Sequence, residues 1–134
     1  MKGCYVLLIE LKKNQDIDIG KLGNISFRKG FYIYIGSAMN GLENRIERHL
    51  RKDKKFHWHI DYFLEKTKIL QIFYKENNKK EECKIAEIFN QNFFSIPNFG
   101  CSDCSCKSHL FYGDVNEILE IISNIEMTNY KRMN

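Results

Sequence analysis

The sequence Tyr32-Ile-Tyr-Ile-Gly-Ser-Ala-Met-Asn-Gly-Leu-Glu-Asn-Arg-Ile-Glu-Arg-His49 decides the predicted fold. The apolar run from Phe31 to Ile35 ends at Gly36, which is typical of a strand followed by a turn. Asn40 then stands where a helix N-cap is expected, and Glu43 follows three residues later as its capping-box partner. The stretch therefore predicts a strand, a turn and a helix in direct succession.

The predicted helix runs from Gly41 to about Lys52 and combines an apolar stripe with a basic face. The stripe repeats every four residues, at Leu42, Ile46 and Leu50. Arg45 and His49 lie one turn apart on a shared face beside it. The preceding strand would bring Tyr34 next to this basic face. The combination is typical of a functional site.

Positive charge is concentrated in the first half of the chain. The formal net charge is +4, but residues 1–68 hold 14 basic and 8 acidic side chains, whereas residues 69–134 hold 7 and 9. The densest part runs from Arg45 to Lys55, and Arg48, Arg51 and Lys52 would attract the backbone of a nucleic acid. A solvated helix face with acidic neighbours is an equally good interpretation of the charge alone.

The composition describes one globular domain spanning residues 1–134. Hydrophobic residues make up 43% and charged residues 28% of the 134 residues. No apolar run approaches the roughly 18 to 20 residues that a membrane span needs. The N-terminus also lacks the pattern of a signal peptide. We therefore expect a cytoplasmic protein with no membrane partner.

Hydrophobic periodicity along the chain predicts an α+β fold: a small antiparallel or mixed sheet flanked by helices. The predicted strands are Cys4–Lys12, Asp16–Ile19, Asn24–Arg28, Gly30–Ile35 and Ile69–Tyr74. The predicted helices after the first are Phe56–Leu64, which could also be a strand, Glu81–Phe93, and one capped by Asp114. Residues 16–28 would form an extra β-hairpin, residues 100–109 a Cys-rich loop, and residues from Thr128 a frayed end.

Five residues offer the chemistry of phosphodiester cleavage: Tyr5, Tyr34, Arg45, His49 and Glu82. That reaction needs a base for water, a cation for the phosphate, and a carboxylate for a divalent metal. A tyrosine base needs a neighbouring cation or metal, because phenol normally titrates near pH 10. By spacing alone, each tyrosine is more typical of a core residue, and Glu82 of a solvated helix start.

Two short motifs resemble the paired signature of the GIY-YIG nuclease superfamily: Gly3-Cys4-Tyr5 and Tyr34-Ile35-Gly36. Arg45-x-x-x-His49 is similar to the arginine and histidine that follow in homing endonucleases of that superfamily. The resemblance is closest to a compact branch described as a domain of unknown function, which also occurs fused to endonuclease III-type DNA glycosylases. Sequence motifs similar to those of that branch span nearly the whole chain: Tyr34-Ile-Gly-Ser-Ala, His57-Trp-His-Ile-Asp61, Glu82-Cys83 and Ser102-Asp-Cys-Ser-Cys-Lys-Ser-His-Leu110.

The resemblance implies a GIY-YIG-like fold and a metal-dependent endonuclease that cuts DNA, in the context of repair. Tyr5 would be the base or its helper and Tyr34 its hydroxyl partner. Arg45 would neutralise the phosphate, His49 would assist proton transfer, and Glu82 would bind one Mg²⁺ or Mn²⁺ ion. This hypothesis requires the tyrosines, Arg45 and Glu82 to converge on one open pocket.

Two other functions compete with the nuclease. The chain could be a nucleic-acid-binding module that keeps the fold without turnover, or a zinc-stabilised domain for protein interaction. A homodimer or a DNA-repair partner is expected in either case, because a domain of this size offers little surface for choosing a target.

His57 and His59, which flank Trp58, form a second group of interest. The histidines would contact nucleic acid, and the indole could stack on a base. The alternative places Trp58 in the core and one histidine in a hydrogen-bond network.

The third group is Cys101-x-x-Cys104-x-Cys106-x-x-His109, with Cys83 as a further ligand. Three thiols and an imidazole can hold a tetrahedral Zn²⁺. Structural zinc sites usually join two segments, which favours the participation of Cys83. Ordinary thiols are the interpretation we slightly prefer from sequence, and a loop that contacts the substrate is a third.

Overall fold

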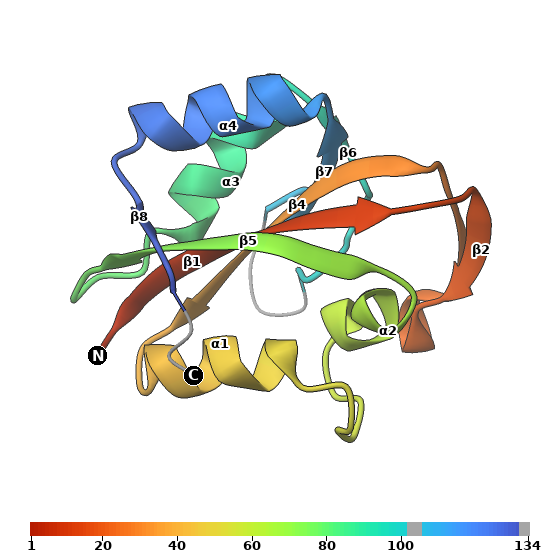
Figure 1. The fold of residues 1–134 in the computed structure, drawn as a ribbon, viewed down its shortest axis with the longest axis horizontal. Helices are drawn as coiled ribbons and strands as arrows, with labels where there is room; N and C mark the ends of the chain where they lie inside the picture. Colours follow the sequence, from red (N-terminus) through yellow and green to blue (C-terminus); the bar gives the residue numbers. More distant parts are fainter. Residues whose placement is uncertain (102–105, 132–134) are drawn as a thin grey trace.

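The computed structural model describes residues 1–101 and 106–131, which form a central antiparallel sheet covered by helices on both faces (Figure 1). The described helices are α1 (Leu42–Leu50), α2 (His59–Glu65), α3 (Glu82–Asn90) and α4 (Val115–Asn124). The strands are β1 (Gly3–Leu11), β2 (Gln15–Asp18), β3 (Asn24–Phe27), β4 (Gly30–Ala38), β5 (Lys68–Glu76), β6 (Phe94–Ser95), β7 (Leu110–Gly113) and β8 (Thr128–Asn129). The α+β class expected from the sequence is confirmed, and every strand pairing among these residues is antiparallel.

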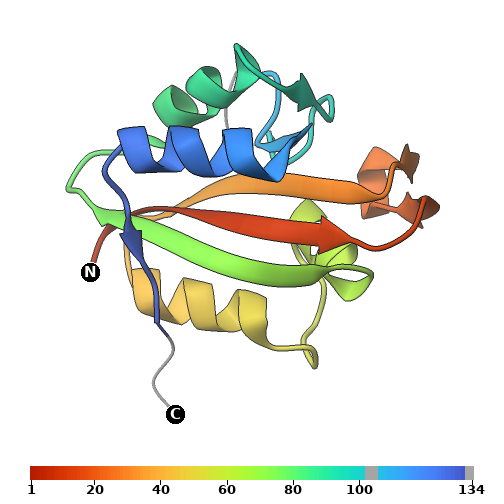
Figure 2. The same ribbon diagram turned by 45° about the horizontal axis from the view of Figure 1, so that its top comes forward.

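Among the residues that the structure describes, strand β1 lies near the middle of a six-stranded sheet with the strand order β6-β7-β4-β1-β5-β8. Its side chains alternate between two cores, because successive residues of a strand point to opposite faces. Tyr5, Leu7 and Ile9 enter the core beneath α1 and α2, while Cys4, Val6 and Leu8 enter the core beneath α3 and α4. Figure 2 shows the resulting three layers. Burial on both faces explains why β1 is apolar from Cys4 to Ile9.

The hairpin insertion lies at the far end of the sheet from Tyr5. Strands β2 and β3 pair only with each other among the described residues, and Ile17, Ile19 and Phe27 pack into the core. The insertion begins where β1 ends, at Leu11. The chain returns to the large sheet at Gly30, the first residue of β4, which pairs with Leu11. At about 3.3 Å per residue, that point is about 20 Å along the strand from Tyr5. The long insertion therefore leaves the register around the two tyrosines intact.

The cap predicted for α1 is wrong. The N-cap is Gly41, in a left-handed conformation with φ of 75°, and no side chain caps the helix. The backbone N–H of Leu42 instead donates to the Met1 carbonyl at 3.0 Å, and that of Arg45 to Gly41. Main-chain acceptors thus replace the side-chain cap expected from Asn40, and glycine supplies the required positive φ. The Asp114 cap of α4 is confirmed: its carboxylate accepts from the N–H groups of Asn116 and Glu117.

Two further expectations need correction. The segment predicted as Phe56–Leu64 is a helix, but it begins only at His59. The frayed end expected from Thr128 is not seen at Tyr130: its N–H donates to the Ile72 carbonyl at 2.7 Å, and its hydroxyl to Glu47 at 2.6 Å, while residues 132–134 lie outside the described residues. The strands β6, β7 and β8 were not predicted, and β6 and β8 are only two residues long, too short to show a period. In the described part of the chain, no helix is long and apolar enough to cross a membrane.

Candidate functional site

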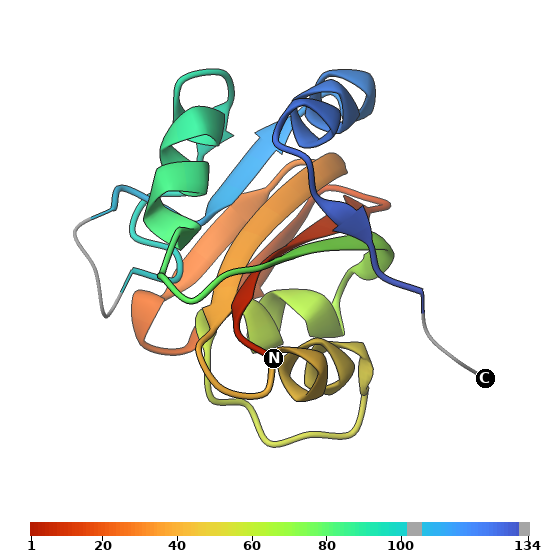
Figure 3. The same cartoon turned by 90° about the vertical axis from the view of Figure 1, so that its left-hand side faces the viewer.

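A cleft of about 580 Å³ opens at the end of the sheet where β1 begins and β4 ends. Figure 3 looks toward this end, with α1 below the sheet and α3 above it. All five residues of the predicted catalytic group line the cleft: Tyr5, Tyr34, Arg45, His49 and Glu82. The other lining residues are Gly36, Ser37, Met39, Asn40, His57, Trp58, His59, Lys80, Gly100 and His109. The structure thus brings together side chains from β1, β4, α1 and α3, and their roles stay predictions.

The pairing of β1 with β4 explains why a glycine follows the second tyrosine. Gly36 lies directly opposite Tyr5, and Tyr34 lies opposite Leu7 on the same face. A Cβ atom at Gly36 would lie 2.4 Å from the ring and hydroxyl atoms of Tyr5. Only glycine therefore leaves room for the Tyr5 ring, diagonally beside Tyr34 in the cleft.

Tyr5 and His49 form a buried, uncharged pair. The Tyr5 hydroxyl lies 2.6 Å from His49 Nε2, and both residues are almost fully buried. Burial raises the pKa of Tyr5 further than Arg45 lowers it. Burial, aided by Lys54, lowers the pKa of His49 to about 3. At neutral pH Tyr5 is therefore a phenol and His49 a neutral imidazole. Arg45 alone does not make Tyr5 a phenolate.

Arg45 and Arg48 lie against Trp58 but face different partners. Each guanidinium carbon is 4.4 Å from the Trp58 ring centroid, a cation–π distance. Arg45 also donates to the Ser37 carbonyl at 3.0 Å and is one of the residues that line the cleft. Arg48 forms two bonds to the buried carboxylate of Asp61, at 2.8 and 2.9 Å. Arg45 thus lines the cleft, while Arg48 neutralises an internal acid.

The remaining residues of the predicted nucleic-acid group are divided between two places. Arg51 and Lys52 line a separate hollow of about 240 Å³ beside α2. The Lys52 amine reaches the Leu64 and Thr67 carbonyls at 3.4 Å. His57, in contrast, is exposed at the mouth of the main cleft. Of these basic residues, His57 therefore shares the cleft with Arg45, whereas Arg51 and Lys52 line the other hollow.

His59 serves the hydrogen-bond network that the sequence offered as one alternative for a histidine. Its Nδ1 accepts from the Gly100 N–H at 2.9 Å, and burial lowers its pKa. This bond ties α2 to the loop that follows Phe99. Trp58 is half-buried and forms part of the cleft wall.

Glu82 is the only carboxylate among the described lining residues of the cleft. It lies in the first turn of α3, where a negative charge suits the helix dipole. Its side chain is 18% exposed, and Lys80 approaches it at 3.8 Å. Lys80, Ser37 and Asn40 were not predicted as site residues, although each is close in sequence to a residue that was. Their closeness in sequence to predicted site residues is the signal that could have identified them.

The Cys-rich group is only partly brought together. The ligand atoms of Cys83, Cys106 and His109 all lie within 4.8 Å of one another. Cys101 is absent from this cluster, and its thiol approaches the Phe99 carbonyl at 3.4 Å. Cys104 lies outside the described residues. The cluster could bind a metal ion, and its thiols and imidazole suit zinc better than magnesium. Ordinary thiols, the interpretation preferred from sequence, and a metal site both stay predictions for this group.

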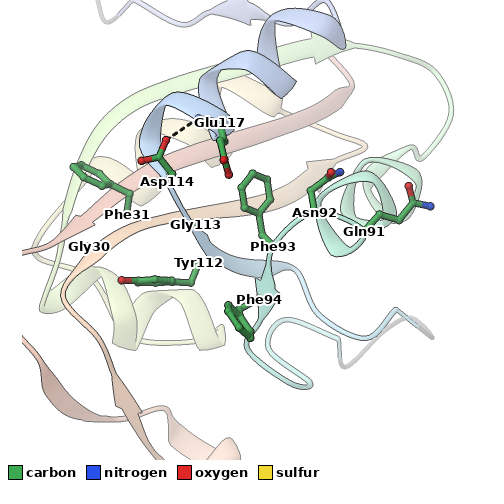
Figure 4. A pocket seen from close by; sticks show the side chains of 10 residues that line it. All are labelled: Gly30, Phe31, Gln91, Asn92, Phe93, Phe94, Tyr112, Gly113, Asp114 and Glu117. Atoms are coloured by element: carbon green, nitrogen blue, oxygen red, sulfur yellow. Dashed lines mark hydrogen bonds between the residues drawn. The ribbon is translucent and has the colours of Figure 1, made fainter.

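A second, more aromatic hollow of about 680 Å³ lies away from these residues, between β7, α3 and α4 (Figure 4). Rings of Phe31, Phe93, Phe94 and Tyr112 line it. Its described lining contains the carboxylates of Asp114 and Glu117 and no lysine or arginine. The charged residues of its described lining are thus both acidic, whereas the cleft at Tyr5 is lined by Arg45 and Lys80 as well as Glu82.

The neutral state of His49 predicts a pH-dependent stability. In the unfolded chain an imidazole titrates near 6.5, whereas the pKa of folded His49 is about 3. The folded state thus binds fewer protons, and His49 should lower the free energy of unfolding by about 1.4 kcal/mol per unit as pH falls from about 6.5. Urea denaturation of wild type and His49→Gln between pH 7 and 4 should show the steeper loss in wild type. Parallel pH profiles would mean that His49 is not held neutral.

A comparison with protein-family models matches residues 4–130 to a family described as Domain of unknown function DUF123. Neither a curated protein nor a solved structure matches the chain. The match covers far more than half of the 134 residues, including β1, the cleft and the Cys-rich loop. The chain therefore belongs to the DUF123 family.

Proposed function

We propose that this domain is a divalent-metal-dependent endonuclease that hydrolyses phosphodiester bonds in DNA. One observation carries the proposal: Tyr5, Tyr34, Arg45, His49 and Glu82 come from four separate elements and line one cleft. The family match does not define an activity. The proposal therefore rests on the chemistry of the cleft and on the resemblance of its residues to GIY-YIG nucleases.

The cleft offers a place for one phosphate between a cation and a carboxylate. Arg45 can give a phosphate two hydrogen bonds from one planar guanidinium. Lys80, whose amine lies 3.8 Å from Glu82, adds a second positive charge to the lining of the cleft. Glu82 fits Mg²⁺ or Mn²⁺, because Mg²⁺ is commonly held by one or two carboxylates together with water and substrate phosphate. When bound, such an ion supplies Lewis acidity and lowers the pKa of a bound water.

The Tyr5–His49 pair supplies a route for a proton. The Tyr5 oxygen can accept a proton from an attacking water while its own proton passes along the 2.6 Å bond to His49 Nε2. His49 is neutral and can accept it. The negative charge of a bound phosphate would raise the pKa of His49 and so favour this transfer. Tyr34 is half-buried beside the pair and would orient the water or a phosphate oxygen.

The test compares Glu82→Gln with Glu81→Gln. Both remove one carboxylate at the start of α3, but Glu81 pairs with Lys75 and does not line the cleft. Radiolabelled single-stranded, duplex, flap and branched DNAs are incubated with wild type and each variant in Mg²⁺ or Mn²⁺. We expect Glu82→Gln to lower the rate of cleavage by about 100-fold or more, equivalent to about 2.7 kcal/mol. Glu81→Gln should stay close to wild type.

The outcomes separate the proposal from its rivals. Equal cleavage by wild type and Glu82→Gln would remove Glu82 from the mechanism. Salt-sensitive DNA binding without cleavage by wild type would instead support a binding module with the same cleft. A role in DNA repair, and a homodimer or a repair protein as partner, are further proposals from the resemblance. Preferred cleavage of flap or branched DNA would support the first of these.

A further inference from the structure

Two segments that are distant in sequence bring soft metal ligands together beside the cleft. Cys83 lies in the first turn of α3, whereas Cys106 and His109 belong to the segment that leads into β7. Their ligand atoms, two sulfurs and one ring nitrogen, all lie within 4.8 Å of one another. Both cysteines are half-exposed, and His109 is buried. An ion could therefore enter from solvent and remain shielded on one side.

We propose that Cys83, Cys106 and His109 bind a Zn²⁺ ion, with water as the fourth ligand. In a tetrahedral site with Zn–S of about 2.3 Å and Zn–N of about 2.0 Å, ligand atoms lie about 3.5–3.8 Å apart. The present spread of up to 4.8 Å needs a closure of about 1 Å, which side-chain rotation can supply. Binding releases the two thiol protons, and two thiolates balance the charge of the ion.

Zinc at this position would fix one wall of the cleft. Cys83 is the neighbour of Glu82, so the ion would hold the turn of α3 that carries the cleft carboxylate. His109 lines the cleft, and its carbonyl accepts from the Ile35 N–H at 2.9 Å, next to Tyr34. The ion would therefore set the distance between Glu82 and the tyrosines. This consequence rests on the proposed function, whereas zinc binding does not.

The first test measures zinc in protein purified from zinc-supplemented cells, without chelators or a metal-affinity tag. We expect about one equivalent of zinc in wild type and less than about one tenth in Cys83→Ser and Cys106→Ser. Cys101→Ser is the matched control, because this thiol lies in the same loop but outside the cluster. It should keep its zinc. Circular dichroism verifies that each variant is folded.

A second measurement reports the ligands directly and does not depend on any variant. Wild-type protein is stripped of zinc and reconstituted with Co²⁺. We expect visible bands of tetrahedral cobalt and near-ultraviolet charge-transfer bands with the intensity of two thiolates. Addition of Zn²⁺ should abolish both. Metal-free, folded wild type that takes up no Co²⁺ or Zn²⁺ would overturn the proposal, and so would a Cys83–Cys106 disulfide in protein purified without reductant.

Nuclease assays on the same samples distinguish the two proposals. If wild type holds stoichiometric zinc but does not cleave DNA, the zinc proposal stands and the proposed function fails. If wild type cleaves DNA but is purified without zinc, the proposed function stands and the zinc proposal fails. If both hold, wild type without zinc should need more Mg²⁺ for half-maximal cleavage than the zinc-bound protein, because Glu82 would be less well positioned.

Discussion

Replacing Tyr5 by phenylalanine is expected to lower the rate of DNA cleavage by about 100- to 10,000-fold, the usual contribution of a positioned acid–base group. The substitution keeps the ring that packs opposite Gly36 and removes only the hydroxyl bonded to His49. Single-turnover cleavage of a labelled duplex measures the chemical step. Because phenylalanine cannot relay a proton, the loss should be in the rate constant and not in DNA affinity.

Tyr32→Phe is the matched control for this prediction. Tyr32 is also a buried tyrosine of the sheet, but its hydroxyl donates to the Arg28 carbonyl at 2.6 Å and does not reach the cleft. Its loss should cost about 1 kcal/mol of stability and leave the cleavage rate unchanged. Comparable rates for Tyr5→Phe and Tyr32→Phe would exclude Tyr5 as the proton acceptor and leave the Tyr5–His49 bond a packing feature.

Replacing Asp61 by alanine is expected to lower the free energy of unfolding by about 3–5 kcal/mol. The Asp61 side chain is fully buried and accepts two bonds from Arg48. It also accepts from the N–H groups of His57 and Trp58, at 2.8 and 2.9 Å. Burial alone would raise the pKa of Asp61, but these donors, Arg48 foremost, hold it below its usual value. Alanine would leave Arg48 and the start of α2 without their acceptor.

Urea denaturation at pH 7 measures this loss, with Asp53→Ala as the control. Asp53 is an exposed acid in the loop between α1 and α2, and its removal should change stability by less than about 0.5 kcal/mol. Arg48→Met should also be strongly destabilising, since it leaves the Asp61 charge buried and unpaired. A loss below about 1 kcal/mol in Asp61→Ala would mean that water replaces the carboxylate, and that Asp61 does not anchor α2.

The same pair gives Arg48 a partner that its position on the helix does not reveal. Along the sequence, Arg45 and Arg48 belong to one basic stretch, and only the family resemblance singled out Arg45 for the phosphate. In the structure one guanidinium lines the cleft and the other is held by a carboxylate thirteen residues away. The loop between α1 and α2 decides this difference, and its path has no periodic signal. The sequence therefore predicted the charge of this region but not which cation is available.

The central strands and main helices were predictable because each carries a local pattern. β1 is apolar from Cys4 to Ile9, α1 repeats its apolar residues every turn, and Asp114 stands at a helix start. The edge strands β6 and β8 were missed, since two residues cannot establish a period. The Asn40 cap failed for a related reason. Its replacement is a main-chain bond from Leu42 to Met1, and no local pattern encodes that long-range contact.

Local sequence patterns were thus sufficient for the α+β class, whereas the family resemblance was needed to single out the residues that line the cleft. Tertiary packing alone determined that Tyr5 meets His49, that Gly36 makes room for the Tyr5 ring, and that Cys83 meets Cys106 and His109. The physical reason is the separation of the partners. Propensity and periodicity act over one or two turns, whereas these contacts join residues that only the strand register and the docking of α1 and α3 bring together.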